Sequence, residues 1–189
     1  HTPLVKEGAD KTYHLADETF FRSLKKKPVI INSARGGIVD TQAIKKAIKE
    51  NLISGAVIDC WENEPQIDLE YLEMVNIATP HIAGYSADGK ANATRMSLES
   101  IAEFYGLDKS PIDAVREPAP ENPFIDLNNL PNSDNKIYDA ILHTYNPMED
   151  YASLKAAPDT FKQLRNNYPL RREYFAYRVL NTIVEERSI

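Results

Sequence analysis

The sequence contains an arginine, a glutamate and a histidine that could serve one reaction. Arg35, Glu64 and His81 each come shortly after a short apolar segment. A guanidinium group can hold a carboxylate through two hydrogen bonds, and an imidazole can exchange a proton near neutral pH. A carboxylate beside the imidazole can fix its tautomer and stabilise its charged form. The three side chains could therefore interconvert a hydroxyl and a carbonyl group in a substrate that carries a carboxylate.

Each of these residues also has an ordinary structural interpretation. Arg35 precedes Gly36 and Gly37, so it could be a surface residue of a tight turn. A single histidine is more often structural than catalytic, and Glu64 could be a solvated loop carboxylate. Asp59 is harder to explain in this way, because a carboxylate at the end of an apolar segment needs hydrogen bonds or a ligand.

The apolar segments before these residues have the length and composition of buried parallel strands. They are residues 28–33, 55–60 and 76–79. Asp40 can cap an amphipathic helix, and residues 86–105 have a helical pattern that ends at Gly106. Strands that alternate with helices predict an α/β fold with part of a doubly wound, Rossmann-like parallel sheet. Ligands bind such sheets beyond the carboxyl ends of the strands, which is where the candidate side chains would lie.

The composition changes near the end of the second helical pattern. All 7 glycines lie at or before Gly106, whereas most of the 12 prolines come after it. We therefore expect residues 1–106 to be the C-terminal part of a Rossmann domain. Residues 107–131 would form an extended, proline-rich connector, and residues 132–189 a small α+β domain.

The expected C-terminal domain has its own pattern. Residues near Ile141 have helical spacing, a second helix can start at Pro158, and residues 173–180 alternate enough to form a strand. The aromatic residues of that strand are Tyr174, Phe175 and Tyr177. They have no obvious partner within the chain, so they predict a homodimer contact, with a local core of the tail as the alternative.

Composition argues against several classes of function. The 22 Lys and Arg residues against 28 Asp and Glu residues give a net charge of -6, which disfavours binding to nucleic acid. The single cysteine, Cys60, has apolar neighbours and suits a buried thiol in a reducing cytoplasm. The 4 histidines lack zinc spacing, and we find neither a serine nucleophile motif nor a Gly-x-Gly-x-x-Gly motif. The apolar runs are too short to span a membrane.

Three motifs of the sequence resemble the signatures of the D-isomer-specific 2-hydroxyacid dehydrogenases in order and spacing. They are Asn-Ser-Ala-Arg-Gly-Gly-Ile-Val-Asp at 32–40, Asp-Cys-Trp-Glu-Asn-Glu-Pro at 59–65 and Thr-Pro-His-Ile-Ala-Gly at 79–84. The opening segment His-Thr-Pro-Leu at 1–4 is similar to the family's segment beside the nicotinamide ribose. The resemblance covers residues 1 to about 106.

The resemblance implies an NAD-dependent enzyme with a catalytic set of Arg35, Glu64 and His81. Arg35 would hold the substrate carboxylate, His81 would exchange the hydroxyl proton, and Glu64 would tune His81. The residues expected to contact NAD are Thr2, Asp59 and Gly84. The residue expected to contact the substrate together with Arg35 is Tyr85.

The segments around Tyr168 and Arg172 resemble a branch of this family that has an added dimerisation domain, which implies a homodimer acting on a phosphorylated 2-hydroxy acid. Two alternatives remain open at this point. One is a family member acting on glycerate or 3-phosphoglycerate, and the other is an NAD-sensing, corepressor-like interaction protein on the same scaffold. The abrupt start at His1 predicts a fragment without its N-terminal half, which would be inactive alone.

Overall fold

The computed structural model describes residues 2–130 and 135–181. Its contacts divide the chain into two compact units, each made of two stretches of sequence. The first unit comprises residues 1–83 and 147–168, and the second comprises residues 84–146 and 169–189. Each unit is described separately below.

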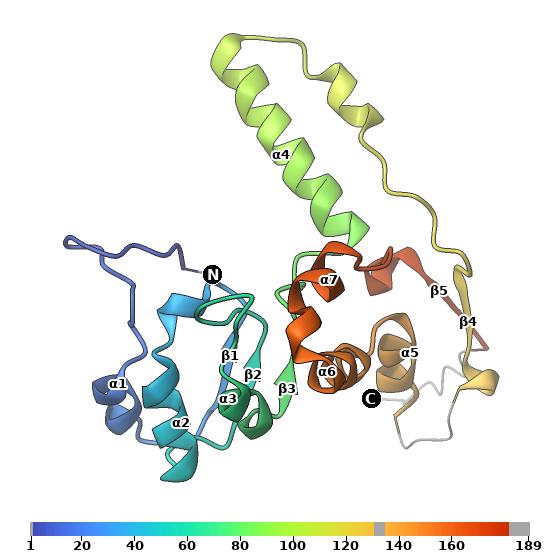
Figure 1. The fold of residues 1–189 in the computed structure, drawn as a ribbon. Coiled ribbons are helices and arrows are strands. Elements are labelled where there is room, and N and C mark those ends of the chain that lie inside the picture. The colour runs from blue at the N-terminus through green and yellow to red at the C-terminus, as the bar shows by residue number, and fades with distance from the viewer. Residues whose placement is uncertain (1, 131–134, 182–189) are drawn as a thin grey trace, which may run out of the picture. The chain divides into compact units, whose positions relative to one another are not determined.

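A parallel sheet with the order β1-β2-β3 forms the centre of the first unit (Figure 1). Its strands are β1 (Val29–Asn32), β2 (Gly55–Ile58) and β3 (Ile77–Ala78). Ile31 pairs with Val57, and Val57 pairs with Ile77. The prediction of a parallel α/β fold is confirmed, and the strands fall within the three apolar segments.

Helices with polar caps connect the strands. The helix α2 (Thr41–Lys49) begins after Asp40, whose carboxylate accepts hydrogen bonds from the backbone N–H groups of Gln42 and Ala43. This is the cap expected from the sequence. The other helices of this part are α1 (Glu18–Ser23), capped by Asp17, and α3 (Leu69–Met74), capped by Asp68.

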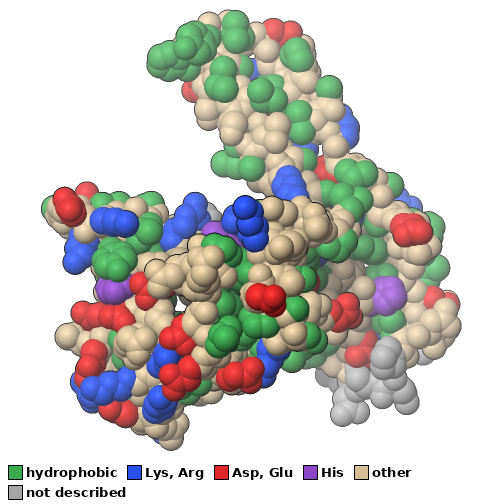
Figure 2. Space-filling view, viewed as in Figure 1, with side chains coloured by type: hydrophobic (Ala, Val, Ile, Leu, Met, Phe, Trp, Pro, Cys, Tyr) green, Lys and Arg blue, Asp and Glu red, His purple; other side chains and the backbone are tan. Residues whose placement is uncertain are grey.

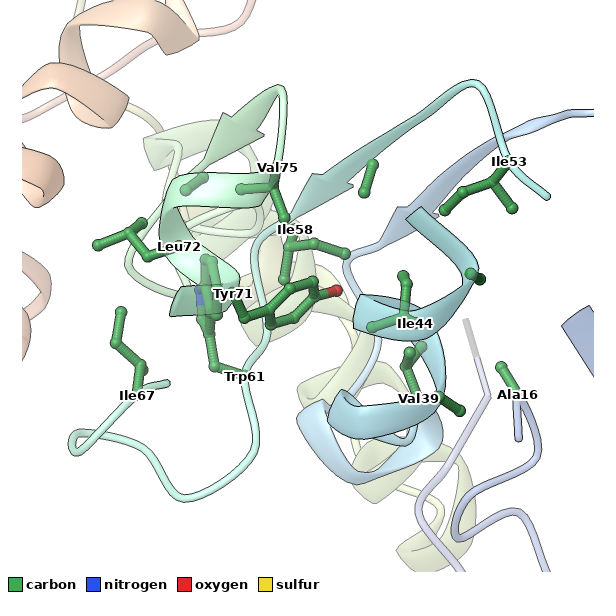
Figure 3. Packing of buried hydrophobic residues seen from close by; sticks show 14 of the residues in the cluster. Ala16, Val39, Ile44, Ile53, Ile58, Trp61, Ile67, Tyr71, Leu72 and Val75 are labelled. Atoms are coloured by element: carbon green, nitrogen blue, oxygen red, sulfur yellow. The ribbon is translucent and has the colours of Figure 1, made fainter. Parts of the chain in front are cut away.

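The core of the first unit lies between the sheet and these helices. Figure 3 shows Ile44 of α2, Ile58 of β2 and Tyr71 of α3 in one buried cluster. The rings of Trp61 and Tyr71 meet edge to face with their centroids 5.2 Å apart. Trp61 lies three residues after the end of β2, so the loop that carries the second motif is anchored in the core.

A part of the chain's C-terminal third also packs into this core. The helices α6 (Pro147–Ala156) and α7 (Phe161–Asn166) bury Leu154 and Phe161 almost completely. The Tyr151 hydroxyl donates to the carbonyl oxygen of Val75 over 3.1 Å, just before β3. The division at residues 106 and 131 stays a prediction, while the contacts place residues 147–168 with the sheet.

The second unit contains the long helix α4 (Ala87–Tyr105). Ser86 caps its start by accepting a hydrogen bond from the N–H of Gly89, and Gly106 ends it in the left-handed conformation at φ 64°. Both ends agree with the sequence prediction. The carboxylate of Asp88, in the first turn, forms a two-point ion pair with Arg172 at 2.9 Å and 2.9 Å.

The remainder of the second unit corrects one expectation. The proposed connector contains β4 (Phe124–Asp126), which pairs in parallel with β5 (Arg178–Leu180). The expected strand at 173–180 is therefore reduced to its last residues, because Tyr174–Ala176 form a 3-10 turn closed by the Tyr177 N–H and the Tyr174 carbonyl. The sequence around β4 is rich in proline and did not indicate a strand, because β4 forms by pairing with β5, which is distant in the sequence. The helix α5 (Lys136–Thr144) contains Ile141, near which the spacing of apolar residues predicted a helix.

None of the helices within residues 2–130 and 135–181 combines the length and the apolar character that crossing a membrane requires.

We expect Leu154→Ala to lower the free energy of unfolding by roughly 2–5 kcal/mol, because it leaves a cavity where α6 packs into the first unit. Leu69→Ala is the matched control, since Leu69 is 57% exposed and Leu154 is 0% exposed. Urea unfolding of both variants measures the difference. Equal losses in the two variants would show that α6 does not pack into this core.

Candidate active site

The turn after β3 holds His81 in an unusual backbone conformation. His81 has φ 57°, a left-handed value that a residue with a Cβ seldom adopts. The same oxygen of Asp59, Oδ1, accepts hydrogen bonds from the backbone N–H groups of Ile82 and Ala83 at 2.7 Å and 3.1 Å. It also accepts one from the hydroxyl of Thr79 at 2.7 Å. Asp59 therefore fixes the turn on both sides of His81.

Glu64 orients the imidazole of His81. The His81 Nδ1 lies 2.8 Å from Glu64 Oε2, and both side chains are mostly buried. The other oxygen of Glu64 accepts a hydrogen bond from the backbone N–H of Trp61 at 2.8 Å. A carboxylate only accepts, so Nδ1 carries the hydrogen and Nε2 is the nitrogen that can exchange a proton with a ligand. This arrangement suits a general acid and base.

The turn after β1 carries Arg35 and is held by a buried asparagine. The Asn32 side-chain N–H₂ group donates to the carbonyl oxygens of Arg35 and Cys60, at 3.1 Å and 3.2 Å. A Cβ on Gly36 would lie 1.8 Å from the carbonyl oxygen of Trp61. The glycine at position 36 therefore lets the backbone of this turn approach the loop after β2 closely.

Arg35 lies beside Thr2, which was expected to contact NAD. The two residues line a cavity of about 190 Å³ together with Pro3 and Ala34. Among the described residues, the Arg35 guanidinium donates to the carbonyl oxygen of Ala34 at 2.6 Å. A guanidinium has five N–H donors, so the exposed Arg35 retains donors that suit a carboxylate.

The expected site residues fall into both compact units. Glu64 and His81 meet directly, and Asp59 holds the backbone next to His81. Gly84 and Tyr85 belong to the second unit. There, the Lys90 ammonium lies 4.6 Å from the centre of the Tyr85 ring.

Cys60 is a buried thiol among these residues. Burial, followed by the negative charge of Asp59, raises the pKa of Cys60 from 9.0 to about 12. The thiol is therefore protonated at neutral pH and is a poor nucleophile. This agrees with the interpretation of Cys60 as structural.

The residues that support the site were not predicted from the sequence. Asn32 and Thr79 are buried polar residues at the ends of β1 and β3. The argument used for Asp59, that a polar group ending an apolar strand needs partners, would have found both. No local pattern in the sequence indicates the contact of His14 with Glu62, because these residues are far apart in the sequence. In the described part of the chain, no group of three His, Cys, Asp or Glu residues could hold a metal ion.

A parallel sheet that presents an arginine and a carboxylate–histidine pair at its carboxyl edge can bind a carboxylate and exchange a proton next to it. Residues 1–83 match the family model described as D-isomer specific 2-hydroxyacid dehydrogenase, NAD binding domain. This match agrees with the resemblance of the three motifs. Residues 118–188 match a second model, described as a domain of unknown function, DUF3410.

Similar proteins extend along nearly the whole chain. The sequence is 53% identical over 180 residues to erythronate-4-phosphate dehydrogenase of Bacteroides thetaiotaomicron, covering 95% of this chain and 49% of that protein. The protein of the same name from Porphyromonas gingivalis is 47% identical over 190 residues, covering 100% and 51%. That from Escherichia fergusonii is 39% identical over 184 residues, covering 95% and 48%. The chain therefore spans about half the length of these curated relatives.

We expect Cys60 in the folded chain to react slowly with iodoacetamide at neutral pH, because its thiol is buried and protonated. Cys60 is the single cysteine, so mass spectrometry of the labelled chain reports on it alone. The same chain in urea is the control and should react at the rate of a free thiol. Equal rates in the two conditions would contradict the buried position.

Proposed function

We propose that this chain carries the catalytic residues of an NAD-dependent dehydrogenase that oxidises 4-phospho-D-erythronate to 2-oxo-3-hydroxy-4-phosphobutanoate. The observation that carries the proposal is the 2.8 Å contact between Glu64 and His81 beyond the carboxyl ends of parallel strands. The reaction would belong to pyridoxal 5'-phosphate (vitamin B6) biosynthesis in the cytoplasm. The substrate follows from the relatives, whose shared name is erythronate-4-phosphate dehydrogenase.

In this proposal the three catalytic residues have separate tasks. Nε2 of His81 removes the proton of the substrate's 2-hydroxyl group as the hydrogen on the same carbon leaves as hydride. Glu64 keeps Nδ1 protonated and stabilises the imidazolium that forms. Arg35 holds the carboxylate next to the reacting carbon, and Tyr85 contacts the same substrate.

The residues around Arg35 suit the nicotinamide end of a dinucleotide. When bound, NAD supplies the hydride acceptor. Thr2 and Arg35 line the same cavity, and Thr2 and Asp59 would contact NAD. Gly84 would complete this contact set. The 189 residues contain no Gly-x-Gly-x-x-Gly turn to bind the NAD phosphates, so we expect this stretch by itself to be inactive.

We also propose that the protein is a homodimer that associates through the second unit. Several apolar side chains of this unit are exposed, and Figure 2 shows such side chains along α4. On the smaller sheet and its helix they surround a cavity of about 330 Å³. Exposed apolar residues of this unit include Phe104 at 81%, Ile137 at 70%, Tyr138 and Phe175 at 65% and Tyr174 at 63%. Surfaces of this kind are typical of subunit contacts.

Substitution of the catalytic histidine tests the enzymatic proposal. In the complete protein that contains this chain, His81→Ala should lower kcat by roughly three orders of magnitude or more, while folding is preserved. His143→Ala, at an exposed position of α5, should retain activity. NADH formation from 4-phospho-D-erythronate is the assay. Unchanged cellular function of His81→Ala would instead favour the NAD-sensing interaction protein.

A substrate panel tests the specificity. We expect kcat/KM for 4-phospho-D-erythronate to exceed that for glycerate and for 3-phosphoglycerate by roughly 100-fold or more. A substrate that leaves polar groups of the site unpaired has a transition state that the enzyme binds less tightly. Steady-state assays of the complete protein measure this ratio. A preference for unphosphorylated glycerate would contradict the assigned substrate.

The dimer has its own test. We expect light scattering at micromolar concentration to give the mass of two chains, and Ile137→Asp to shift it toward one, because the change places a charge in an apolar contact. Glu121→Lys, a charge reversal at another exposed position of the same unit, is the control and should remain dimeric. A monomeric mass for the unsubstituted protein would exclude the dimer.

A further inference from the structure

The loop after β2 forms a second carboxylate–histidine contact besides the one at His81. The Nε2 of His14 lies 2.7 Å from Oε1 of Glu62, and the contact joins residues 48 positions apart. Both side chains are largely buried, at 29% and 17% exposure. The catalytic role proposed above does not use this pair.

Glu62 lies in the middle of the turn that presents Glu64. The turn is closed by the hydrogen bond from the Trp61 N–H to Glu64, and Asn63 within it has a left-handed φ of 62°. The second oxygen of Glu62 accepts a hydrogen bond from the N–H of Thr41 at 2.8 Å, in the first turn of α2. Glu62 thus joins the turn to α2 on one side and to His14 on the other.

Several contacts fix the backbone and the ring of His14. Its backbone N–H donates to the carbonyl oxygen of Gly37 at 2.8 Å, and its ring stacks on Tyr13 with the centroids 3.9 Å apart. The ring's Nδ1 lies 3.4 Å from Oδ2 of Asp40. His14 also has a left-handed φ of 55°, and such strain persists only where the surroundings fix it. The segment that begins beside Thr2 is therefore attached to both motif loops.

Without His14, Glu62 would have another donor nearby. Among the described residues, the buried hydroxyl of Tyr71 has no hydrogen-bond partner. Burial raises the pKa of that hydroxyl, and the charge of Glu62 adds to the effect. A carboxylate that loses one donor tends to turn toward another, since a buried unpaired charge is costly. Such a turn of Glu62 would displace the backbone on which Glu64 depends.

We propose that His14 is a positioning residue, which by donating to Glu62 holds the turn of Trp61–Pro65 so that Glu64 stays within hydrogen-bonding distance of His81. The effect on turnover rests on the proposed dehydrogenase function, whereas the effect on the His81 ring does not. His14 acts through Glu62 and Glu64 and touches neither substrate nor cofactor.

The first experiment observes the His81 ring directly. In the complete protein labelled with ¹⁵N in histidine, at a pH where the imidazoles are neutral, we expect a single His81 tautomer with the hydrogen on Nδ1. His14→Phe retains a ring to stack on Tyr13 but removes the donor, and it should give His81 signals averaged between tautomers. His143→Phe is the matched control and should leave them unchanged.

The second experiment measures turnover. His14→Phe should lower kcat by roughly 10- to 100-fold with KM changed by less than about threefold, because a small displacement of a catalytic group slows chemistry more than binding. His14→Gln, whose amide can still donate to Glu62, should recover part of the loss. Glu62→Gln keeps an acceptor for Thr41 and tests the same contact if His14→Phe does not fold. Glu7→Gln, at an exposed position, is its control.

The outcomes separate the two proposals. Averaged His81 signals in a protein without dehydrogenase activity would support the positioning role and overturn the proposed function. An unchanged His81 ring and unchanged kcat in folded His14→Phe, or in folded Glu62→Gln, would overturn the positioning role. A loss of thermal stability with an unchanged His81 ring would also overturn it, since His14 would then act on stability alone.

Discussion

One carboxylate oxygen joins the ends of the strands that carry the candidate site. Oδ1 of Asp59 accepts three hydrogen bonds from the turn after β3, and the backbone N–H of Asp59 donates to the carbonyl oxygen of Asn32 at the end of β1. The carboxyl ends of all three strands therefore meet at this residue. His81 can keep its left-handed backbone because its neighbours on both sides are fixed in this way. The rest of the site depends on that constraint.

The loop that follows Asp59 contributes both to the core and to the candidate site. The indole of Trp61 packs against Tyr71, and its N–H donates to the carbonyl oxygen of Thr79 at 3.0 Å. Three residues later, Glu64 meets His81. Because both contacts come from one short turn, a change in the packing of Trp61 would directly alter the position of Glu64 beside the His81 imidazole. This loop lies within residues 1–83, which match the 2-hydroxyacid dehydrogenase family model.

The sequence predicted the features that depend on local chemistry. The cap at Asp40, the left-handed end at Gly106 and the partners required by Asp59 follow from short-range rules, and the structure contains all three. Features that depend on residues far apart in the sequence could not be predicted from local patterns. The strand β4 exists because β5 pairs with it from 54 positions away, since Phe124 is in register with Arg178. The aromatic residues before β5 were wrongly assigned to a strand, because Tyr174–Ala176 form a 3-10 turn.

The edge of the parallel sheet has a consequence for handling this chain. β1 is an edge strand of the sheet formed by the described residues, and Val29 and Ile31 on it are 53% and 70% exposed. An uncovered apolar edge presents unpaired backbone N–H and carbonyl groups that can recruit a strand from another molecule. Produced as these 189 residues, the polypeptide should be prone to self-association into insoluble material, and a lysine in place of Ile31 would be a rational way to keep it in solution.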